Sequence, residues 1–444
     1  MEPVSRQFPT GEAVPAISPV YPFNQPGQPV VLYDGPIGAL ADAPGVVELS
    51  CLPDLNVVWR IEASSSAAGA PSDSVTLVLR RPEGDARVPG VWRGRTDGWS
   101  NGAAIGKADV PLKRIVTHWF NLPDLHGPIA ITTTEVGDEG WLGRWQTEVG
   151  GWRLTLDVRP DHVRVWKDLH KARVYVMTHV MEIRRADGAT FTAAGAEPLL
   201  TALHVGISFA LGRWAAPLLP VGQDGTGTLV WEDWRPAHCD PASTTSPGWW
   251  HERQHASLTD FLGRVIAAFA DPDRQPALRL QLMLGIAATN DQGFVEQRVM
   301  MGAAGLEHLM WQTLVLEGGM TKRQYGRAHS HELLRRVLTD AQVPTDIDTA
   351  LLPVTARFAA EEQARHGRVL DGPDVVTKVR NRLVHPKGAQ ERVYRLDGLV
   401  AEVWLLTRHY LALLILHSLG YQGTYRDLRK TRGWAGEVGN VPWM

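Results

Sequence analysis

The strongest constraint on this chain is a change in the spacing of its hydrophobic residues near residue 250. Before that point, short apolar stretches alternate with polar residues in the two-residue period of β-strands; beyond it, apolar residues recur every three or four positions, as on the buried face of an α-helix. A turn-rich segment, residues 244–248, separates the two patterns. The sequence therefore predicts an α+β protein with a β-rich domain over residues 1–250, a helical bundle over residues 251–425 and a basic C-terminal tail over residues 426–444.

Six segments of the first part carry the strand pattern, because they are rich in β-branched and aromatic residues and are bounded by Gly, Pro or Asp. They are residues 56–63, 74–80, 152–158, 162–167, 173–183 and 227–234. One helix is expected near residues 199–212. Strands separated by irregular loops predict a β-sandwich or a β-barrel-like domain, and the pattern leaves the order of the strands open.

Seven segments of the second part carry the helical pattern. They are residues 258–270, 277–289, 294–316, 332–338, 347–365, 375–385 and 396–419. The last of them is apolar on nearly every side and stops at Gly420, which is typical of the central helix of a bundle.

The composition narrows the class of protein. With 44% hydrophobic and 21% charged residues and a net charge of −3, the chain is neither disordered nor polybasic overall. Its two cysteines, Cys51 and Cys239, exclude a disulfide scaffold and fit a reducing cytosol. The first 30 residues lack the pattern of a signal peptide, and the longest apolar run, Leu411 to Leu416, is too short for a membrane span. We therefore expect a cytoplasmic protein without membrane contact.

The two parts differ in charge and in tryptophan content. Residues 1–250 hold 21 Lys and Arg against 27 Asp and Glu, whereas residues 251–444 hold 24 against 21; 13 of the 17 tryptophans precede residue 251. Tryptophans in a β-domain mostly build its core, because each buries a large apolar area.

Familiar cofactor and metal signatures are missing from the sequence. It contains no GxSxG, no GxGxxG after a strand and no HExxH. His329 and His331 lie on different faces of a helix start and are better explained as part of a helix cap. Glu362 and His366 share a helical face, but two ligands do not close a metal site. The prediction is therefore that the protein uses no metal and no cofactor.

One helical segment, residues 371–387, stands apart. Asp371 is placed to cap a helix that starts near Pro373, and Pro386 disfavours helical geometry at His385, so this histidine is expected at the helix end. At about 100° per residue one buried stripe is formed by Val375, Val376, Val379 and Leu383, while Asn381 and His385 lie together on the opposite side. These polar residues point away from their own core and need a ligand or a second subunit to complete a site.

The charges around this segment favour a polyanion. Residues 378–395 carry six cations against one acid, Glu391, which gives +5 within 18 residues of a nearly neutral protein. The cations are Lys378, Arg380, Arg382, Lys387, Arg392 and Arg395. Such a patch attracts phosphate backbones, and arginine can grip a phosphate through two hydrogen bonds. A histidine that titrates near neutrality is suited to acid–base cleavage.

Residues 380–385, Arg-Asn-Arg-Leu-Val-His, resemble the R-polar-x3-H motif of HEPN ribonucleases. The polar residue directly after the arginine, the following proline and the long apolar helix downstream match together, and the resemblance covers about residues 256–425. A β-rich region placed before such a bundle is also similar to the arrangement in ApeA-type abortive-infection proteins of bacteria.

The resemblance implies a metal-independent endoribonuclease. HEPN domains form dimers in which two motifs face each other, and the 2′-hydroxyl of RNA attacks the adjacent phosphorus to leave a 2′,3′-cyclic phosphate. His385 would then be the general acid/base, Arg380 would stabilise the charge of the phosphorane, and Asn381 would orient His385 or the phosphate. The RNA substrate, for which tRNA is one candidate, would be contacted by Lys378, Arg382, Lys387, Arg392 and Arg395.

The residues leave two questions open. Glu307, in an otherwise apolar helix, either helps to line the cleft or, as we favour, forms an ordinary buried pair with an arginine. The β-rich domain is expected to restrain the nuclease and to sense a trigger of phage origin, as an anti-phage effector requires. The alternative is a catalytically inactive HEPN dimerisation module that carries a β-domain for a peptide or carbohydrate ligand.

Overall fold

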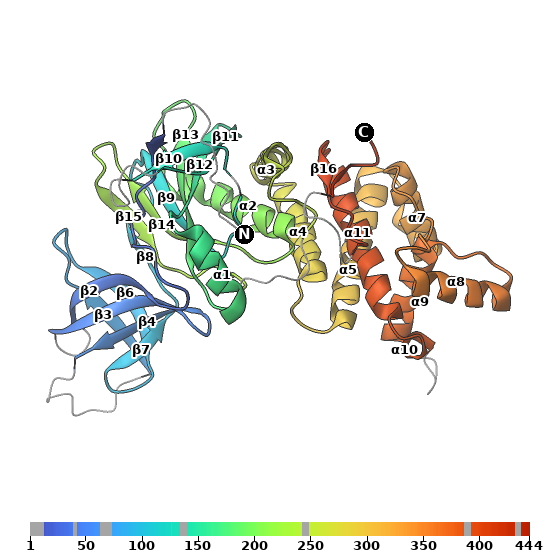
Figure 1. Cartoon of the computed structure of the whole chain (residues 1–444), viewed down its shortest axis with the longest axis horizontal. Helices are drawn as coiled ribbons and strands as arrows, with labels where there is room; N and C mark the ends of the chain where they lie inside the picture. The colour runs from blue at the N-terminus through green and yellow to red at the C-terminus, as the bar shows by residue number, and fades with distance from the viewer. Residues whose placement is uncertain are drawn as a thin grey trace, which may run out of the picture. The chain divides into compact units, whose positions relative to one another are not determined.

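A computed structural model describes residues 13–38, 42–62, 73–125, 127–133, 140–241, 248–385, 392–430 and 437–444 (Figure 1). The chain forms two compact units. The first comprises Met1–His204 and Ala215–Thr244, and the second comprises Val205–Trp214 and Thr245–Met444. The first is built mainly from strands and the second mainly from helices, so the α+β prediction is confirmed. The predicted break at residues 244–248 lies, apart from Gly248, outside the described residues.

The first unit begins with a small closed barrel in the order β2-β3-β4-β7-β6-β5. Its strands are β2 (Val30–Gly38), β3 (Asp42–Cys51), β4 (Leu55–Ile61), β5 (Ser74–Leu79), β6 (Ala86–Trp92) and β7 (Asp97–Ser100). Alternate residues point inward, so Val47, Val57 and Leu77 are fully buried. The indole rings of Trp59 and Trp92 meet edge to face, with centroids 4.6 Å apart. The barrel is thus filled by its own side chains.

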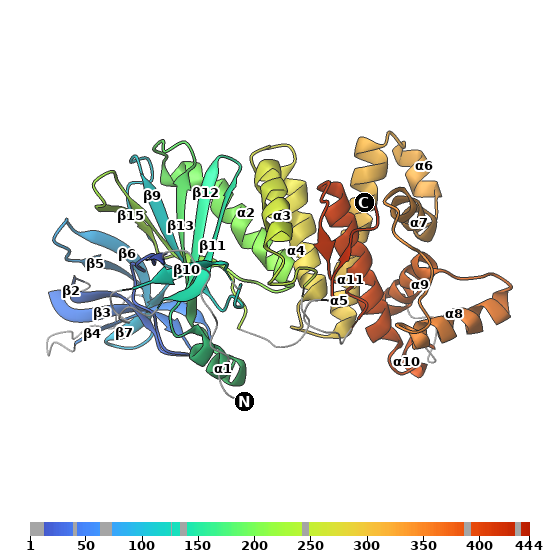
Figure 2. The same cartoon turned by 45° about the horizontal axis from the view of Figure 1, so that its top comes forward.

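The rest of the first unit is a nine-stranded sheet in the order β1-β10-β11-β12-β13-β9-β14-β15-β8. Only the short β1 pairs in parallel; the other described ladders of this sheet are antiparallel. The strands are β1 (Val14–Pro15), β8 (Ala104–Gly106), β9 (Arg114–Phe120), β10 (Ile129–Thr132), β11 (Trp141–Val149), β12 (Trp152–Val158), β13 (Met177–Arg185), β14 (Pro217–Gln223) and β15 (Leu229–Asp233). Figure 2 shows β12 and β13 side by side.

One face of this sheet has two different parts. At one end Val116, Val180 and Val221 join the barrel residues in a common hydrophobic cluster. At the other end the same face carries Arg114, Thr155, Glu182 and other polar residues that line a cavity. Leu154 and Ile183, on the opposite face, are fully buried.

Two helices accompany the sheet, α1 (His162–Ala172) and α2 (Ala193–Leu211). The second confirms the helix predicted near residues 199–212. The strand predicted at residues 162–167 is wrong, because this segment lies in α1. Val165 and Leu169, four residues apart, are both buried, and this helical spacing outweighs a short alternating pattern. The strand predicted at residues 173–183 begins only at Met177, because Arg173 caps α1 in the left-handed conformation with φ 50°.

The second unit is a bundle of helices. They are α3 (His255–Phe269), α4 (Gln275–Thr289), α5 (Val295–Trp311), the π-helix η1 (Gln312–Glu317), α6 (Lys322–Arg327), α7 (Ser330–Asp340), α8 (Pro353–His366), α9 (Gly372–Val384), α10 (Arg392–Arg395) and α11 (Leu399–Ser418). Each of the seven predicted helical segments overlaps one of these helices, although α8 starts six residues later than predicted. The short α6 and α10 were not predicted, because six and four residues are too few to show a period.

Helix α11 is the centre of the bundle and contacts α4, α5, α8 and α9. Most of its residues are buried on every side, as its apolar sequence predicts. Arg408 is buried like its neighbours although it is charged. Its guanidinium lies over the ring of Trp404 and donates two hydrogen bonds to the carbonyl of Leu428. Burial lowers the pKa of Arg408 to about 10. By length and composition α2 and α11 could each cross a membrane, but 56% and 89% of their apolar windows are packed inside the protein.

The chain end adds the two-stranded β16 (Thr424–Tyr425) and β17 (Gly439–Asn440). Within the predicted basic tail, Leu428 and Val441 are buried. Arg429 pairs with Asp427 at 2.8 Å, and Lys430 pairs with Glu437. These two cations of the tail are therefore held in ion pairs.

Candidate functional site

Helix α9 positions the motif residues. Asp371 caps the helix by accepting a hydrogen bond from the amide of Asp374 at 3.0 Å, and Pro373 occupies the first turn. Val375, Val376 and Val379 are buried and anchor the helix in the bundle. The predicted start and cap of this helix are confirmed, and so is its buried stripe except at Leu383, which is only partly buried. The polar side is left facing outward.

Two carboxylates at the base of α9 form a network with basic side chains. Arg335 reaches both Asp371 and Asp374, and Arg368 reaches Asp374 at 2.7 Å. Burial and the neighbouring Asp371 raise the pKa of Asp374, whereas hydrogen bonds from Arg335 and Asp374 outweigh the effect of burial and lower the pKa of Asp371. The network links α7 to the start of α9 and fixes the orientation of the motif helix.

Arg380 is held in place from two sides. Its Nη2 lies 2.9 Å from Oε1 of Glu307 on α5, and its Nη1 donates to Oδ1 of Asn381 at 3.0 Å. Its Nε is buried without a hydrogen-bond partner among the described residues, and 27% of its side chain is exposed. The guanidinium is therefore oriented, but it retains donors that can bind an incoming anion.

Glu307 is the partner of the motif arginine. The sequence favoured a buried pair between Glu307 and an arginine. The pair exists, with Arg380 itself, but it is not buried, because 44% of the Glu307 side chain is exposed. Glu307 thus orients Arg380 and remains partly exposed beside it.

Asn381 and His385 are both exposed, as predicted. His385 is the C-cap of α9, and its amide donates to the carbonyl of Asn381 at 2.8 Å. The two side chains therefore leave the helix one turn apart, at its C-terminal end. Val384, between them, exposes 40% of its surface.

Lys378 and Arg382 have a different environment from the one that the sequence predicted. Both reach the carboxylate of Glu362 on α8, at 2.8 and 3.2 Å, and the guanidinium of Arg382 lies 5.2 Å from the ring centre of Phe358. Only 2% of the Glu362 side chain is exposed. Arg365 lies 3.5 Å from the same carboxylate, so three permanent cations share one acid. Direct RNA contact by Lys378 and Arg382 remains a prediction, and their ion pairs show a structural role that the sequence did not reveal.

The carboxylate of Glu362 remains ionised in this environment. Burial by itself raises its pKa, but hydrogen bonds from Lys378 and Arg382 outweigh burial, and the net effect lowers the pKa of Glu362. In the sequence, Glu362 showed only an i,i+4 relation to His366, which lies 3.8 Å away. Nothing in the sequence marked it as the acceptor for α9, because its partners are 16 and 20 residues distant.

A cavity of about 290 Å³ adjoins this cluster. Its walls come from α7, α8 and α9 and the segment between the last two. They include His331, Glu362, His366, Arg368, Lys378 and Asn381. Asn381 therefore borders both the exposed end of α9 and this cavity.

The remaining predicted RNA contacts are only partly described. Arg395, on α10, is exposed. Lys387 lies outside the described residues, as does the side chain of Arg392. The structure therefore brings together Arg380, Asn381 and Glu307 in direct contact and leaves His385 on the same exposed helix end.

Metal ligation has no support in the described part of the chain. No group of three or more His, Cys, Asp or Glu residues there is placed to hold an ion. His329 is the N-cap of α7, as the sequence indicated, and its ring stacks on that of His331 with centroids 5.4 Å apart. The chemistry available at α9 is that of a guanidinium, an amide and an imidazole.

Two regions of the chain match models of known domain families. Residues 107–245 match the YopA central domain, and residues 271–440 match the YopA C-terminal domain. The chain is also 25% identical over 308 residues to the SPbeta prophage-derived uncharacterized protein YopA of Bacillus subtilis (strain 168). That match covers 68% of this chain and 66% of the relative, and no solved structure matches the chain. The two domain models correspond to most of the nine-stranded sheet and most of the helical bundle, so the barrel lies outside both.

Proposed function

We propose that this protein is a metal-independent endoribonuclease of the HEPN type. The observation that carries the proposal is the end of α9, where Asn381 and His385 are exposed one turn apart and Arg380 is oriented by Glu307. An exposed imidazole and an oriented guanidinium on the same helix offer the two functions that transesterification of RNA requires, because protons must move and a pentavalent phosphorus must be stabilised.

Each motif residue has a distinct role in this mechanism. The 2′-hydroxyl attacks the adjacent phosphorus, its proton passes to a base, and the leaving 5′-oxygen takes a proton from an acid. His385 supplies proton transfer, and Arg380 stabilises the added negative charge of the phosphorane. Asn381, which accepts a hydrogen bond from Arg380, keeps the guanidinium aligned with the phosphate. No metal or cofactor takes part.

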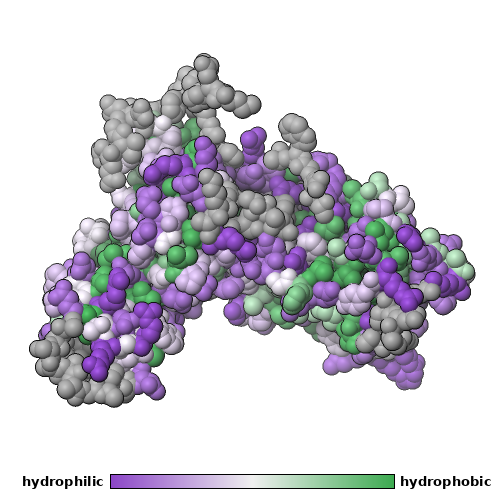
Figure 3. Space-filling model, turned by 60° about the horizontal axis from the view of Figure 1, so that its bottom comes forward, coloured by the Kyte–Doolittle hydropathy of each residue, from purple (hydrophilic) through white to green (hydrophobic). Residues whose placement is uncertain are grey.

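A second copy of the chain would complete the site. In-line cleavage requires a base and an acid on opposite sides of the phosphorus, and each chain offers one His385 at the end of α9. The same unit exposes apolar residues that a dimer would cover: Phe294, Val384 and Tyr394 are 74%, 40% and 64% exposed. Figure 3 shows hydrophobic residues gathered on the face of the helical unit that is turned toward the viewer. We therefore propose a homodimer through the helical unit.

The biological setting that we propose is anti-phage defence in the cytoplasm. A ribonuclease of this type harms its host unless it is restrained, and the β-rich first unit is the candidate restraint, released by a trigger of phage origin. The similarity to a prophage-derived protein favours a role in conflicts that involve phages. RNA, with tRNA as one candidate, is the proposed substrate.

Cleavage of labelled RNA by the full-length chain in EDTA tests the proposal. Wild type should cut, and His385→Ala should reduce the rate by a factor of about 10²–10⁴, the usual contribution of a general acid or base. His329→Ala, a change at another exposed histidine of the same unit, should cut at the wild-type rate. A folded wild type that cuts no RNA under inducing or resting conditions would leave the inactive dimerisation module as the better account.

A further inference from the structure

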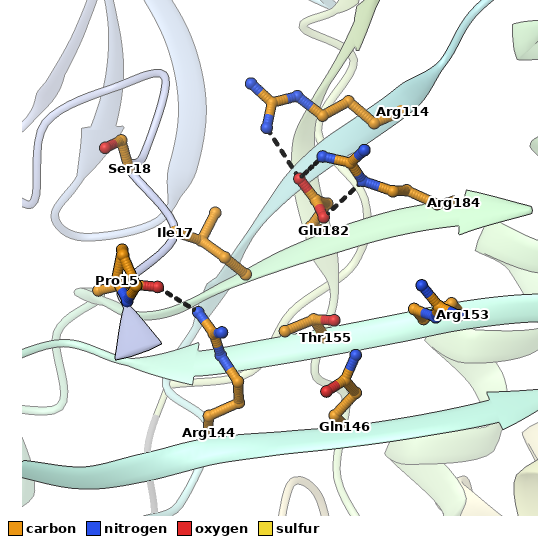
Figure 4. Close-up of a pocket in the computed structure, with 11 residues that line it drawn as sticks. Pro15, Ile17, Ser18, Arg114, Arg144, Gln146, Arg153, Thr155, Glu182 and Arg184 are labelled. Carbon is orange, nitrogen blue, oxygen red and sulfur yellow. Dashed lines mark hydrogen bonds and ion pairs between the residues drawn. The ribbon is translucent and has the colours of Figure 1, made fainter. Parts of the chain in front are cut away.

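A second polar cavity lies on the nine-stranded sheet of the first unit. Its volume is about 460 Å³, within the range of sites for small molecules. The side chains project from β9, β11, β12 and β13, and the segment of residues 15–18 borders the opening (Figure 4). Its polar lining consists of Ser18, Arg114, Arg144, Gln146, Arg153, Thr155, Glu182 and Arg184. Four of these residues are arginines and one is an acid.

The sheet register places the arginines close together although they are far apart in the sequence. Arg153 on β12 is directly opposite Arg184 on β13. Like charges at directly opposite positions of an antiparallel pair are destabilising. The two guanidinium groups therefore repel each other at this point of the sheet, and a bound anion would reduce this repulsion.

The local acids do not balance the arginines. Arg114 and Arg184 share the single carboxylate of Glu182, with contacts of 2.8 Å and 2.7 Å (Figure 4). Arg153 pairs with Glu148 at 2.7 Å, but both side chains are about half exposed, so water weakens this pair. Hydrogen bonds from Arg184 and Arg114 outweigh burial and lower the pKa of Glu182, which stays ionised. The cavity therefore keeps a net positive charge, although residues 1–250 as a whole are acidic.

The cavity wall is also preorganised. Arg144 forms a two-pronged pair with the buried Asp157, both contacts at 2.7 Å, and donates to the carbonyl of Pro15. Asp157 in turn accepts a hydrogen bond from the backbone amide of Ile17 at 2.7 Å. These bonds tie the border segment to the sheet. Arg144 therefore needs little reordering when a ligand enters, which reduces the cost of binding.

We propose that this cavity binds a phosphate-bearing small molecule of nucleotide size. Guanidinium groups match phosphate oxygens in charge and in geometry. Arg114 and Arg184 each have one terminal nitrogen that makes no hydrogen bond to Glu182 and can turn toward the ligand. Gln146 and Thr155 add neutral hydrogen-bonding groups for the rest of such a molecule. The site gives the first unit a ligand of its own and does not depend on the nuclease proposal.

Calorimetric titration of the full-length chain with ATP, AMP and inorganic phosphate tests the site. Affinity should fall in that order, and Arg184→Gln and Arg153→Gln should each weaken ATP binding about tenfold, in line with the loss of one charge-assisted contact. Arg60→Gln is the matched control, because Arg60 makes a similar 2.7 Å pair with Glu48 but lies in the barrel, away from the cavity.

Thermal unfolding of each variant verifies that the chain is folded before titration. Three results would overturn the inference: no binding of any of the three probes, equal affinity in wild type and in both cavity variants, or an equal loss in Arg60→Gln. Binding of an oligoribonucleotide without binding of a mononucleotide would also overturn it, because the site would then belong to a polymer. None of these results bears on whether His385 is required for RNA cleavage.

Discussion

The helix α9 and the nine-stranded sheet each carry a cluster of cations, and the two clusters are built in opposite ways. On α9, Lys378 and Arg382 converge on the buried Glu362, and their main effect is to join α9 to α8. On the sheet, Arg153 faces Arg184 across two strands, and the cations surround an open cavity. The first arrangement stabilises the fold, whereas the second keeps charge available for a ligand. A count of basic residues therefore does not by itself locate a binding surface.

Helix α9 itself carries two arginines in different environments. Arg382 lies against Phe358 and the buried Glu362, while Arg380 pairs with the half-exposed Glu307. Arg380 also donates a hydrogen bond to the exposed motif residue Asn381. On this account Arg380 acts in catalysis and Arg382 acts in structure.

The largest effect is expected for Arg380→Ala. Loss of the guanidinium should slow RNA cleavage by about 10²–10³-fold, as for the removal of one charge-stabilising donor, and leave ATP binding on the sheet unchanged. Initial rates of cleavage in EDTA measure the first effect, and calorimetry measures the second. Arg323→Ala, an exposed change on α6, serves as the control; an equal loss of rate there would break the distinction drawn for Arg380.

A smaller effect on cleavage is expected for Glu307→Gln. The amide still accepts a hydrogen bond but no longer holds Arg380 by charge, so we expect a loss of about three- to tenfold, mainly in kcat. Glu307→Asp should recover part of the rate, because it restores the charge. A loss as large as that of Arg380→Ala, without recovery in Glu307→Asp, would contradict a positioning role.

For Glu362→Gln the expected effect is on stability. The change leaves Lys378 and Arg382 without their carboxylate, and because both cations are partly exposed we expect a cost of about 1–2 kcal/mol in the free energy of unfolding at pH 7. The lowered pKa of Glu362 means that its contribution is present above its ordinary value of 4.5 and is lost as the pH falls below it. Denaturant titrations at pH 7 and pH 4 should therefore show a smaller difference between wild type and variant at pH 4. An undiminished difference would show that the ion pairs are not its source.

The smallest effect is expected for Glu182→Gln on the sheet. Removal of the acid shared by Arg114 and Arg184 should raise the affinity for ATP by about two- to fivefold. The net positive charge of the cavity increases, but solvent and salt screen the effect because the cavity is open to the surface. It should cost about 1 kcal/mol or less in stability, less than Glu362→Gln. Reduced ATP affinity in a folded variant would mean that Glu182 orients the arginines more than it neutralises them.

The candidate site on α9 was predictable because its residues are close in the sequence. Asp371 as cap, the valine stripe and the exposed pair Asn381 and His385 all follow from helical spacing and from Pro386. The partners of the motif helix were not predictable in the same way. Glu362 was visible only as a neighbour of His366, and Glu307 only as a charge in an apolar helix.

The sheet site could not be predicted from the sequence at all. Its arginines are spread over 71 positions and become neighbours only through the strand register, which the alternating pattern does not specify. The same limit explains the error at residues 162–167, where a short segment fitted both a strand and the first turns of α1. The overall succession of a β-rich part and a helical part was predictable, because long segments with a clear period are least ambiguous.

The end groups of RNA cut by the full-length protein in EDTA test the central claim most directly. Attack by the 2′-hydroxyl, with His385 transferring protons, predicts fragments that end in a 2′,3′-cyclic phosphate and begin with a 5′-hydroxyl, and His385→Ala should form them about 10²–10⁴-fold more slowly. Fragments with 3′-hydroxyl and 5′-phosphate ends, or cleavage by His385→Ala at the wild-type rate, would contradict the mechanism proposed for α9.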